Sequence, residues 1–272
     1  MMFNYFFGSD FRSVPYLEVL NSKVENLQVV TIKPKQSGRG QKLKPNPVEN
    51  FCVENGIPFS YFKNDAIYSD MTKGLCVSFG LIFSKSFLEA NAPLYNIHLS
   101  LLPSYVGPSP VENSILNRES LSGITVFEIN TNIDEGGIVY QKSLQLNESM
   151  YSSDVYEECV NIFIKNYEEI ATSEKIIPQK HNLPPSKTSK FTKSDFLLNS
   201  KEYEVAKLMI RAFDSIGPAF IKYNDKFYKI HKFTNNPNGF PIELNGGILY
   251  PLVITPEGKK KMQVEDYIRG NK

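Results

Sequence analysis

The chain has 272 residues, of which 41% are hydrophobic and 22% are charged, and its formal net charge is +1. These proportions are those of an ordinary globular protein, and no apolar run reaches the roughly 20 residues that a membrane-spanning helix needs. We therefore expect no membrane partner, and enough length for one large domain and one smaller domain.

In the first half of the chain, apolar segments with the spacing of strands alternate with segments that have the spacing of helices. This order predicts an α/β fold with a Rossmann-like, mainly parallel sheet covered by helices. Ligands of such sheets bind at the carboxyl ends of the strands. Strands are predicted at 2–7, 27–31, 74–79, 96–99, 125–129 and 138–144, and helices at 13–22, 47–55, 85–90 and 111–117.

The second part of the chain has a different composition. A long amphipathic helix is predicted at 152–174, whereas residues 181–194 have few side chains to bury and are predicted to form a linker. A helix at 203–213 and short β-rich pieces separated by Asn-Gly and Gly-Gly turns follow. We expect one domain over 1–180, a linker over 181–194, and a small β-rich domain shaped like an open barrel over 195–272.

Charge is distributed unevenly between these parts. Residues 1–179 carry 14 Lys and Arg against 20 Asp and Glu, while residues 180–272 carry 16 against 9. A basic C-terminal part suits the binding of a polyanion, because fixed cations release the counterions that condense on phosphates. The alternative is a basic surface that serves only solubility.

The cysteines and histidines give no sign of a metal site. Cys52, Cys76 and Cys159 are widely spaced, form no C-x-x-C pattern, and are interpreted as buried thiols. The chain has only three histidines besides, so zinc ligands would have to come from scattered positions. We therefore expect no metal.

Two short segments contain residues that could carry chemistry. Asn96 and His98 stand two apart on a predicted strand, so both side chains leave one face and can donate hydrogen bonds to one developing oxyanion. Asp134, followed by Gly136 and Gly137 in a turn between strands, is the expected partner that orients His98. Taken one at a time, each has a simpler interpretation, namely a hydrogen-bonded core histidine and an ordinary hairpin turn.

Together, the run N-x-H-x-S-L-L-P-x-Y-x-G-x-x-P from Asn96 and the later run T-V-x-x-x-x-x-x-I-D-x-G-x-I from Thr125 resemble the folate-dependent formyltransferases. The resemblance implies a formyltransferase domain in which Asn96, His98 and Asp134 are catalytic and 10-formyltetrahydrofolate is the formyl donor. In that scheme Asn96 and His98 polarise the formyl oxygen, and Asp134 supports His98. The same resemblance places the folate against Ser78, Phe79, Gly80, Leu81, Ser100, Leu101, Leu102, Pro103, Gly136 and Gly137.

Further stretches that begin at Phe6, Gly38, Arg211 and Pro256 are similar to the methionyl-tRNA formyltransferases, and this similarity covers nearly the whole chain. It implies formyl transfer to the methionine of initiator tRNA, and an OB-like C-terminal domain, here shortened. The glycines of the basic loop at 38–44 make it mobile, and its cations can contact phosphates, although a disordered surface loop is the alternative. The residues expected to bind tRNA are Arg39, Lys42, Lys44, Arg211, Lys259, Lys260 and Lys261.

The sequence departs from the family pattern at two positions of the catalytic run. Val106 stands where the family usually has arginine, and Leu99 replaces a frequent proline or glycine. These departures predict that local contacts to folate or to the acceptor differ.

Three rival functions follow from the same residues: a sugar-nucleotide amine N-formyltransferase with the same folate donor, a folate hydrolase, and a binding protein without turnover. The N-terminus lacks the basic leader and cleavage site of a secretion signal. We therefore expect a monomer in the cytoplasm of a bacterium. The mitochondrial matrix is the alternative if a leader has been removed.

Overall fold

The computed structural model describes residues 2–37, 42–91, 93–179 and 186–270. Contacts divide the chain into two compact units. Two segments that precede residue 158 group with the C-terminal part, while the domain limits expected at 180 and 195 stay a prediction. Unit 1 comprises Met1–Gly107, Gly123–Leu144 and Glu158–Lys187, and unit 2 comprises Pro108–Ser122, Gln145–Glu157 and Thr188–Lys272.

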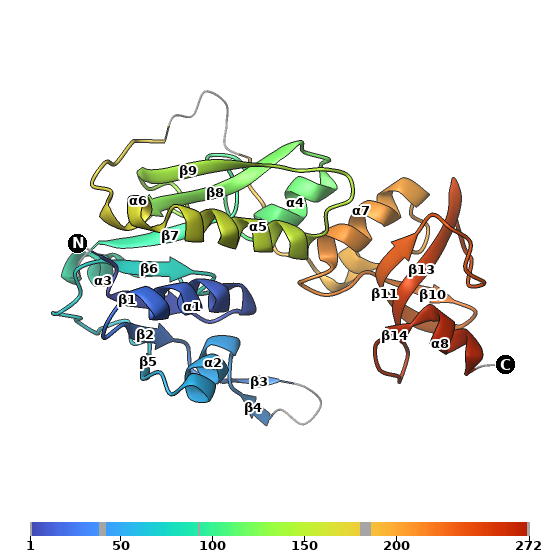
Figure 1. Ribbon diagram of the computed structural model, residues 1–272, viewed down its shortest axis with the longest axis horizontal. Helices are drawn as coiled ribbons and strands as arrows, with labels where there is room; N and C mark the ends of the chain where they lie inside the picture. The colour runs from blue at the N-terminus through green and yellow to red at the C-terminus, as the bar shows by residue number, and fades with distance from the viewer. Residues whose placement is uncertain (1, 38–41, 92, 180–185, 271–272) are drawn as a thin grey trace. The chain divides into compact units, whose positions relative to one another are not determined.

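A seven-stranded sheet in the order β5-β2-β1-β6-β7-β8-β9 forms the centre of unit 1 (Figure 1). The pairs from β5 to β7 are parallel, and β8 joins β7 in the antiparallel direction. The predicted α/β class with a mainly parallel sheet is therefore confirmed. The strands are β1 (Tyr5–Gly8), β2 (Gln28–Thr31), β5 (Phe59–Tyr61), β6 (Gly74–Val77), β7 (Leu94–His98), β8 (Leu121–Glu128) and β9 (Ile138–Gln145), with a separate hairpin of β3 (Lys35–Ser37) and β4 (Lys42–Lys44).

Both faces of β1 are covered. Phe6 and Phe7 point to opposite faces because side chains alternate along a strand, and both are fully buried. Phe7 packs edge-on against Phe79, Phe83 and Phe87, with ring centroids 5.6 to 6.4 Å apart. This aromatic cluster fixes the segment that follows the carboxyl end of β6.

Local signals explain most helix limits in unit 1. Helix α2 (Pro47–Asn55) begins where Asn46 accepts a hydrogen bond from the Glu49 amide at 3.0 Å, and it ends at Gly56, whose φ is +65°. The other helices are α1 (Val14–Lys23), preceded by a 3-10 turn at Phe11–Ser13, and α3 (Lys85–Ala90).

The single helix predicted at 152–174 is wrong. The structure has α5 (Ser152–Lys165) and α6 (Tyr167–Thr172), with a break at Asn166. The Asn166 side chain donates to the Ile162 carbonyl at 2.7 Å. Asparagine competes with helix continuation through such local bonds, and hydrophobic periodicity does not register this competition.

Unit 2 contains an antiparallel sheet in the order β10-β11-β13-β12, with β14 paired to β13. Helix α7 packs against β11, β13 and α4. The sheet forms a half-barrel, so the prediction of a β-rich C-terminal part is confirmed. The elements are α4 (Pro110–Leu116), α7 (Tyr203–Phe213), a 3-10 turn at Lys193–Phe196, β10 (Phe220–Tyr223), β11 (Lys226–Thr234), β12 (Ile242–Leu244), β13 (Gly247–Pro256), β14 (Met262–Gln263) and α8 (Val264–Arg269).

Helices long and apolar enough to cross a membrane are absent from the described ranges.

Candidate active site

Asn96 and His98 lie on β7, in the middle of the unit 1 sheet. Asn96 is in register with Cys76 of β6 on one side and with Phe127 of β8 on the other. The two side chains share one face of the strand, and the His98 side chain is only 7% exposed. The Asn96 amide is half-buried and forms no hydrogen bond with another side chain or backbone group of the described ranges, so it is available as a donor.

Two groups from other segments hold the imidazole of His98. Its Nε2 is 2.9 Å from the Tyr105 carbonyl oxygen and therefore carries the hydrogen, because a carbonyl oxygen can only accept. Its Nδ1 is 3.6 Å from Oδ2 of Asp134, whose side chain is 14% exposed. When Nδ1 takes up a proton, this carboxylate stabilises the resulting imidazolium. The pair can therefore accept a proton from an attacking amine.

Asp134 occupies the turn between β8 and β9 in a left-handed conformation, with φ of +55°. Its Oδ2 accepts a hydrogen bond from the Gly107 amide at 2.8 Å. A Cβ at Gly136 would lie 1.7 Å from the Glu128 carbonyl oxygen, so only glycine lets the turn approach β8 this closely. Gly136 therefore serves a close backbone approach, and Gly137 leaves room for the Ile176 side chain.

A hydrogen-bonded loop connects β7 to Tyr105. The Thr125 hydroxyl donates to the Ser100 carbonyl at 2.6 Å and accepts from the Leu102 amide at 3.1 Å. Gln141 donates to the same hydroxyl and to the Leu102 carbonyl, at 2.9 and 3.0 Å. These contacts fix the loop whose end supplies the carbonyl that holds His98.

Val106 is buried at 4% exposure and packs with Leu102 and Phe127. Where the family pattern has arginine, this chain therefore places a small apolar cluster next to the loop. The second departure, Leu99, is also buried.

The residues expected to contact folate lie in three places in unit 1. Ser78 and Gly80 follow β6 with positive φ of 44° and 79°, and Leu81 is exposed, whereas Phe79 is buried. The segment from Ser100 to Pro103 is the loop just described, and Gly136 and Gly137 adjoin Asp134. The first set follows β6, which pairs with β7, and the second follows β7 itself. The third set lies in the turn between β8 and β9, beside Asp134.

Cys76 is fully buried next to this site. Burial raises the pKa of its thiol, and the negative charge of Asp134 raises the pKa further. The thiol is therefore neutral at physiological pH and is a poor nucleophile. Among the described residues, no group of three or more His, Cys, Asp or Glu side chains could hold a metal ion.

The residues expected to bind tRNA differ in their exposure to solvent. Lys44 on β4 is exposed, and so are Lys259, Lys260 and Lys261. Arg211 is 9% exposed on α7, and burial lowers the pKa of its guanidinium. Arg211 is thus largely shielded from solvent in unit 2, and its contact with RNA stays a prediction. Arg39 and the side chain of Lys42 lie outside what the structure describes.

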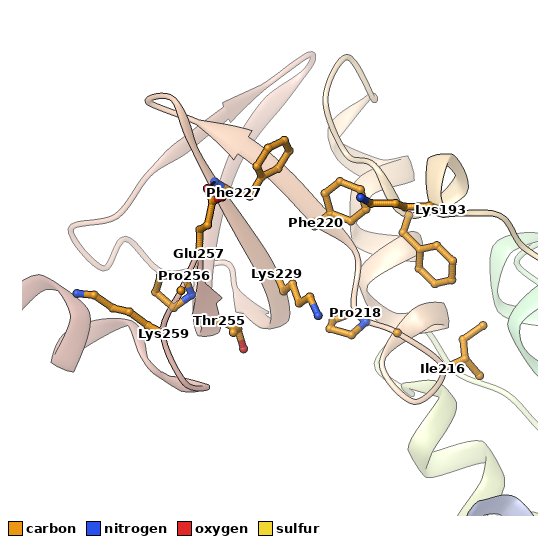
Figure 2. A pocket seen from close by; sticks show the side chains of 13 residues that line it. Lys193, Ile216, Pro218, Phe220, Phe227, Lys229, Thr255, Pro256, Glu257 and Lys259 are labelled. Carbon is orange, nitrogen blue, oxygen red and sulfur yellow. Dashed lines mark hydrogen bonds between the residues drawn. The ribbon is translucent and has the colours of Figure 1, made fainter. Parts of the chain in front are cut away.

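Unit 2 has a pocket of about 620 Å³ that sequence reasoning did not identify. Figure 2 shows Phe220 and Phe227 at this pocket, with Lys229 extending between Thr255 and Pro218. Phe227 is 43% exposed, and the cations that line the pocket, Lys193, Lys229 and Lys259, are exposed. The pocket therefore combines accessible aromatic rings with positive charge.

Sequence reasoning also missed Gln179 and Ser186. Gln179 donates to two carbonyl groups of the Asp134 turn, and Ser186 accepts a hydrogen bond from the Tyr105 amide. Both lie in or beside polar, proline-containing sequence, which resembles a linker. No local pattern distinguishes such residues from solvent-exposed ones.

The model of the Formyl transferase family matches residues 16–165. A methionyl-tRNA formyltransferase of Fervidobacterium nodosum is 35% identical over 242 residues, which is 83% of this chain and 76% of that protein. A methionyl-tRNA formyltransferase of Clostridium acetobutylicum is 29% identical and covers 98% of this chain and 96% of its own.

Among solved structures, an N-formyltransferase from Helicobacter canadensis in complex with folinic acid and dTDP-3-aminofucose has a TM-score of 0.62. It is 22% identical to this chain and covers 97% of it and 99% of its own length. At this identity the likeness concerns the fold.

Proposed function

Since the chain belongs to the Formyl transferase family, we propose that it transfers the formyl group of 10-formyltetrahydrofolate to the amino group of methionine on initiator tRNA. The observation that carries the proposal is the arrangement of Asn96, His98 and Asp134, an available amide donor beside a histidine and carboxylate pair. The names of the two bacterial relatives favour methionyl-tRNA as the acceptor.

The arrangement suits direct attack by a neutral amine. The amine nitrogen bonds to the formyl carbon, and the Asn96 amide donates to the oxygen that becomes negatively charged. Nδ1 of His98 takes a proton from the attacking nitrogen, and Asp134 stabilises the imidazolium. The bond from the formyl carbon to the folate nitrogen then breaks, and the His98 imidazolium returns its proton to this nitrogen as tetrahydrofolate leaves. The neutral thiol of Cys76 supports a mechanism without a covalent enzyme intermediate.

In the sequence-based scheme His98 also polarises the formyl oxygen. Its Nε2 hydrogen is directed at the Tyr105 carbonyl, so this role requires the ring to exchange that contact for the substrate. We therefore assign the donor role first to Asn96 and the proton-accepting role to His98. The folate is proposed to lie along the segments from Ser78 to Leu81 and from Asp134 to Gly137.

The charge of unit 2 supports an RNA acceptor. Lys193, Lys229 and Lys259 offer cations to phosphates, and the rings of Phe220 and Phe227 offer faces on which an unpaired base can stack. Among the residues expected to bind tRNA, Arg39 of the loop at 38–44 is our first candidate for recognising the acceptor end. Location in the bacterial cytoplasm or the mitochondrial matrix, and the monomeric state, stay predictions.

The test is transfer of labelled formyl from 10-formyltetrahydrofolate to three acceptors in parallel: methionyl initiator tRNA, methionyl elongator tRNA and an amino-sugar nucleotide. Selective formylation of the initiator is expected. Formylation of the sugar nucleotide alone would replace the proposal by the sugar-nucleotide function. Release of formate without any acceptor would indicate a hydrolase.

A further inference from the structure

The segment after α6 contacts the turn that carries Asp134. Ile177 and Ile138 exchange two backbone hydrogen bonds, at 2.7 and 2.8 Å, as in an antiparallel pair of strands. Ile176 lies against Gly137, where a Cβ would come within 2.2 Å of its side chain. The backbone at 176–177 is thus fixed beside the start of β9, and it delivers Gln179 to the turn.

Gln179 uses both hydrogens of its amide nitrogen on this turn. Nε2 donates to the Asp134 carbonyl at 2.8 Å and to the Gly136 carbonyl at 2.9 Å. Its Oε1 is buried and has no hydrogen-bond partner among the described residues. A buried carbonyl oxygen without a partner is unfavourable for stability, so the favourable contribution of this side chain comes from its two donors.

The turn needs such support because Asp134 is a non-glycine residue in the left-handed region, at φ of +55°. This conformation persists only where surrounding contacts impose it. Two side-chain contacts act directly on Asp134 and its neighbour: the Gly107 amide holds the carboxylate, and Gln179 holds the carbonyls of Asp134 and Gly136. Loss of the second contact lets the backbone relax and moves the carboxylate away from Nδ1 of His98.

On the Nε2 side of His98, the segment that contains Ser186 holds Tyr105. Ser186 Oγ accepts from the Tyr105 amide at 2.7 Å, and the Ser186 carbonyl accepts from the Val106 amide at 2.8 Å. The Tyr105 carbonyl is the partner of His98 Nε2. Segments on each side of residues 180–185 therefore hold the two groups between which the imidazole lies.

We propose that Gln179 is a positioning residue for formyl transfer, which acts by bridging the Asp134 and Gly136 carbonyls and so keeps the Asp134 carboxylate opposite His98. This inference rests on the proposed function for its kinetic test but not for its spectroscopic one. Gln179 itself touches none of the reacting groups.

Two substitutions separate the donors from the volume of the side chain. Gln179→Met keeps the length of the side chain and removes both donors, whereas Gln179→Glu sets a carboxylate against two carbonyl oxygens. The matched control is Asn91→Ala in the same unit, because Asn91 also donates to two carbonyl groups, those of Ala66 and Phe87.

In the full chain, with the acceptor that the wild-type protein formylates, Gln179→Met should lower kcat by about 10- to 100-fold, the loss expected when a catalytic group is misplaced. KM for both substrates should change by less than about threefold, since the substitution leaves substrate contacts in place. Gln179→Glu should lose more activity than Gln179→Met. Asn91→Ala should lower the melting temperature while kcat stays within about twofold.

The second readout is the nitrogen chemical shifts of the His98 ring, measured on protein with labelled histidine. These shifts should change in Gln179→Met and remain as in the wild type in Asn91→Ala. Wild-type kcat in Gln179→Met together with unchanged His98 signals would overturn the proposal. If no acceptor is formylated by the wild type, the proposed function fails, and the His98 signals still decide the positioning role.

Discussion

The site around His98 and the pocket beside Phe227 are built from different kinds of side chain. The His98 and Asp134 side chains are 7% and 14% exposed, and each is tied to backbone groups. In the pocket Phe227 is 43% exposed, and Lys193, Lys229 and Lys259 are exposed as well. Fixed, desolvated groups act most strongly on a transition state, whereas mobile cations act on the capture of an anionic partner. Substitutions in the first region should therefore change kcat, and substitutions in the second should change KM.

The largest effect is expected from the catalytic residues themselves. Replacing Asn96, His98 or Asp134 by alanine should lower kcat by about 10²- to 10⁴-fold, because each removes a donor or a proton acceptor that acts in the transition state. Circular dichroism should show a retained fold. Wild-type activity in all three variants would contradict the assignment of the site to unit 1.

A smaller loss is expected from the turn. In Gly136→Ala the new Cβ would lie 1.7 Å from the Glu128 carbonyl oxygen, so the backbone around Asp134 must move. We expect kcat to fall by about 10- to 100-fold and stability to fall by about 1–3 kcal/mol. Gly56→Ala at the exposed end of α2 is the control, since nothing lies within 4 Å of its Cβ position. It should lose some stability and keep its kcat.

The pocket should give the converse result. Removing the Phe227 ring by Phe227→Ala should raise KM for tRNA about tenfold through lost stacking, with kcat nearly unchanged. Lys229→Gln should raise KM less, and it should reduce the slope of log KM against log salt concentration by about 0.9. Lys226→Gln, an exposed lysine on β11 outside the pocket lining, is the matched control. If Phe227→Ala or Lys229→Gln instead lowered kcat and left KM unchanged, the proposed difference between the pocket and the His98 site would be wrong.

The smallest effect is expected in the pH dependence of the free energy of unfolding, through His231 of unit 2. Burial, followed by the charge of Lys261, lowers the pKa of His231 to about 4 from 6.5, with Lys229 and Lys232 contributing and Asp214 opposing. Above pH 6.5 the ring is neutral in the folded and the unfolded chain. As the pH falls from about 6.5 towards 4, only the unfolded chain takes up the proton, so the free energy of unfolding decreases. Urea unfolding at pH 7.5 and at pH 5 should show this decrease, and His231→Gln should reduce it.

Elements with strong local signals were predicted closely. The helices expected at 47–55, 85–90 and 203–213 have those limits in the structure. The first two begin at side-chain caps, Asn46 and Ser84, which act over a few residues, whereas the third follows the spacing of its apolar residues. The break at Asn166 was missed, since the periodicity of buried residues continues through it.

The candidate site was predictable in part. Alternation along a strand brings Asn96 and His98 together from sequence alone, and the structure confirms their common strand. Arg211 was expected at an RNA surface from its similarity to a family element, yet α7 buries it. Its surroundings include Tyr151 and Glu148, which are distant in the sequence, so the residues next to Arg211 do not reveal its burial.

The sequence by itself determined the alternation of strands and helices, the pair on β7 and the glycine turn after Asp134, because these follow from spacing within a few residues. It did not indicate the edge strand β5 or the hairpin of β3 and β4, which are only three residues long each. Only the tertiary structure decided that the Tyr105 carbonyl and the Asp134 carboxylate take opposite sides of the His98 ring. It also decided that Gln179 and Ser186, from sequence with the composition of a linker, hold those two groups. The physical reason is that these are single hydrogen bonds between segments about 45 to 81 residues apart, which leave no periodicity in the chain.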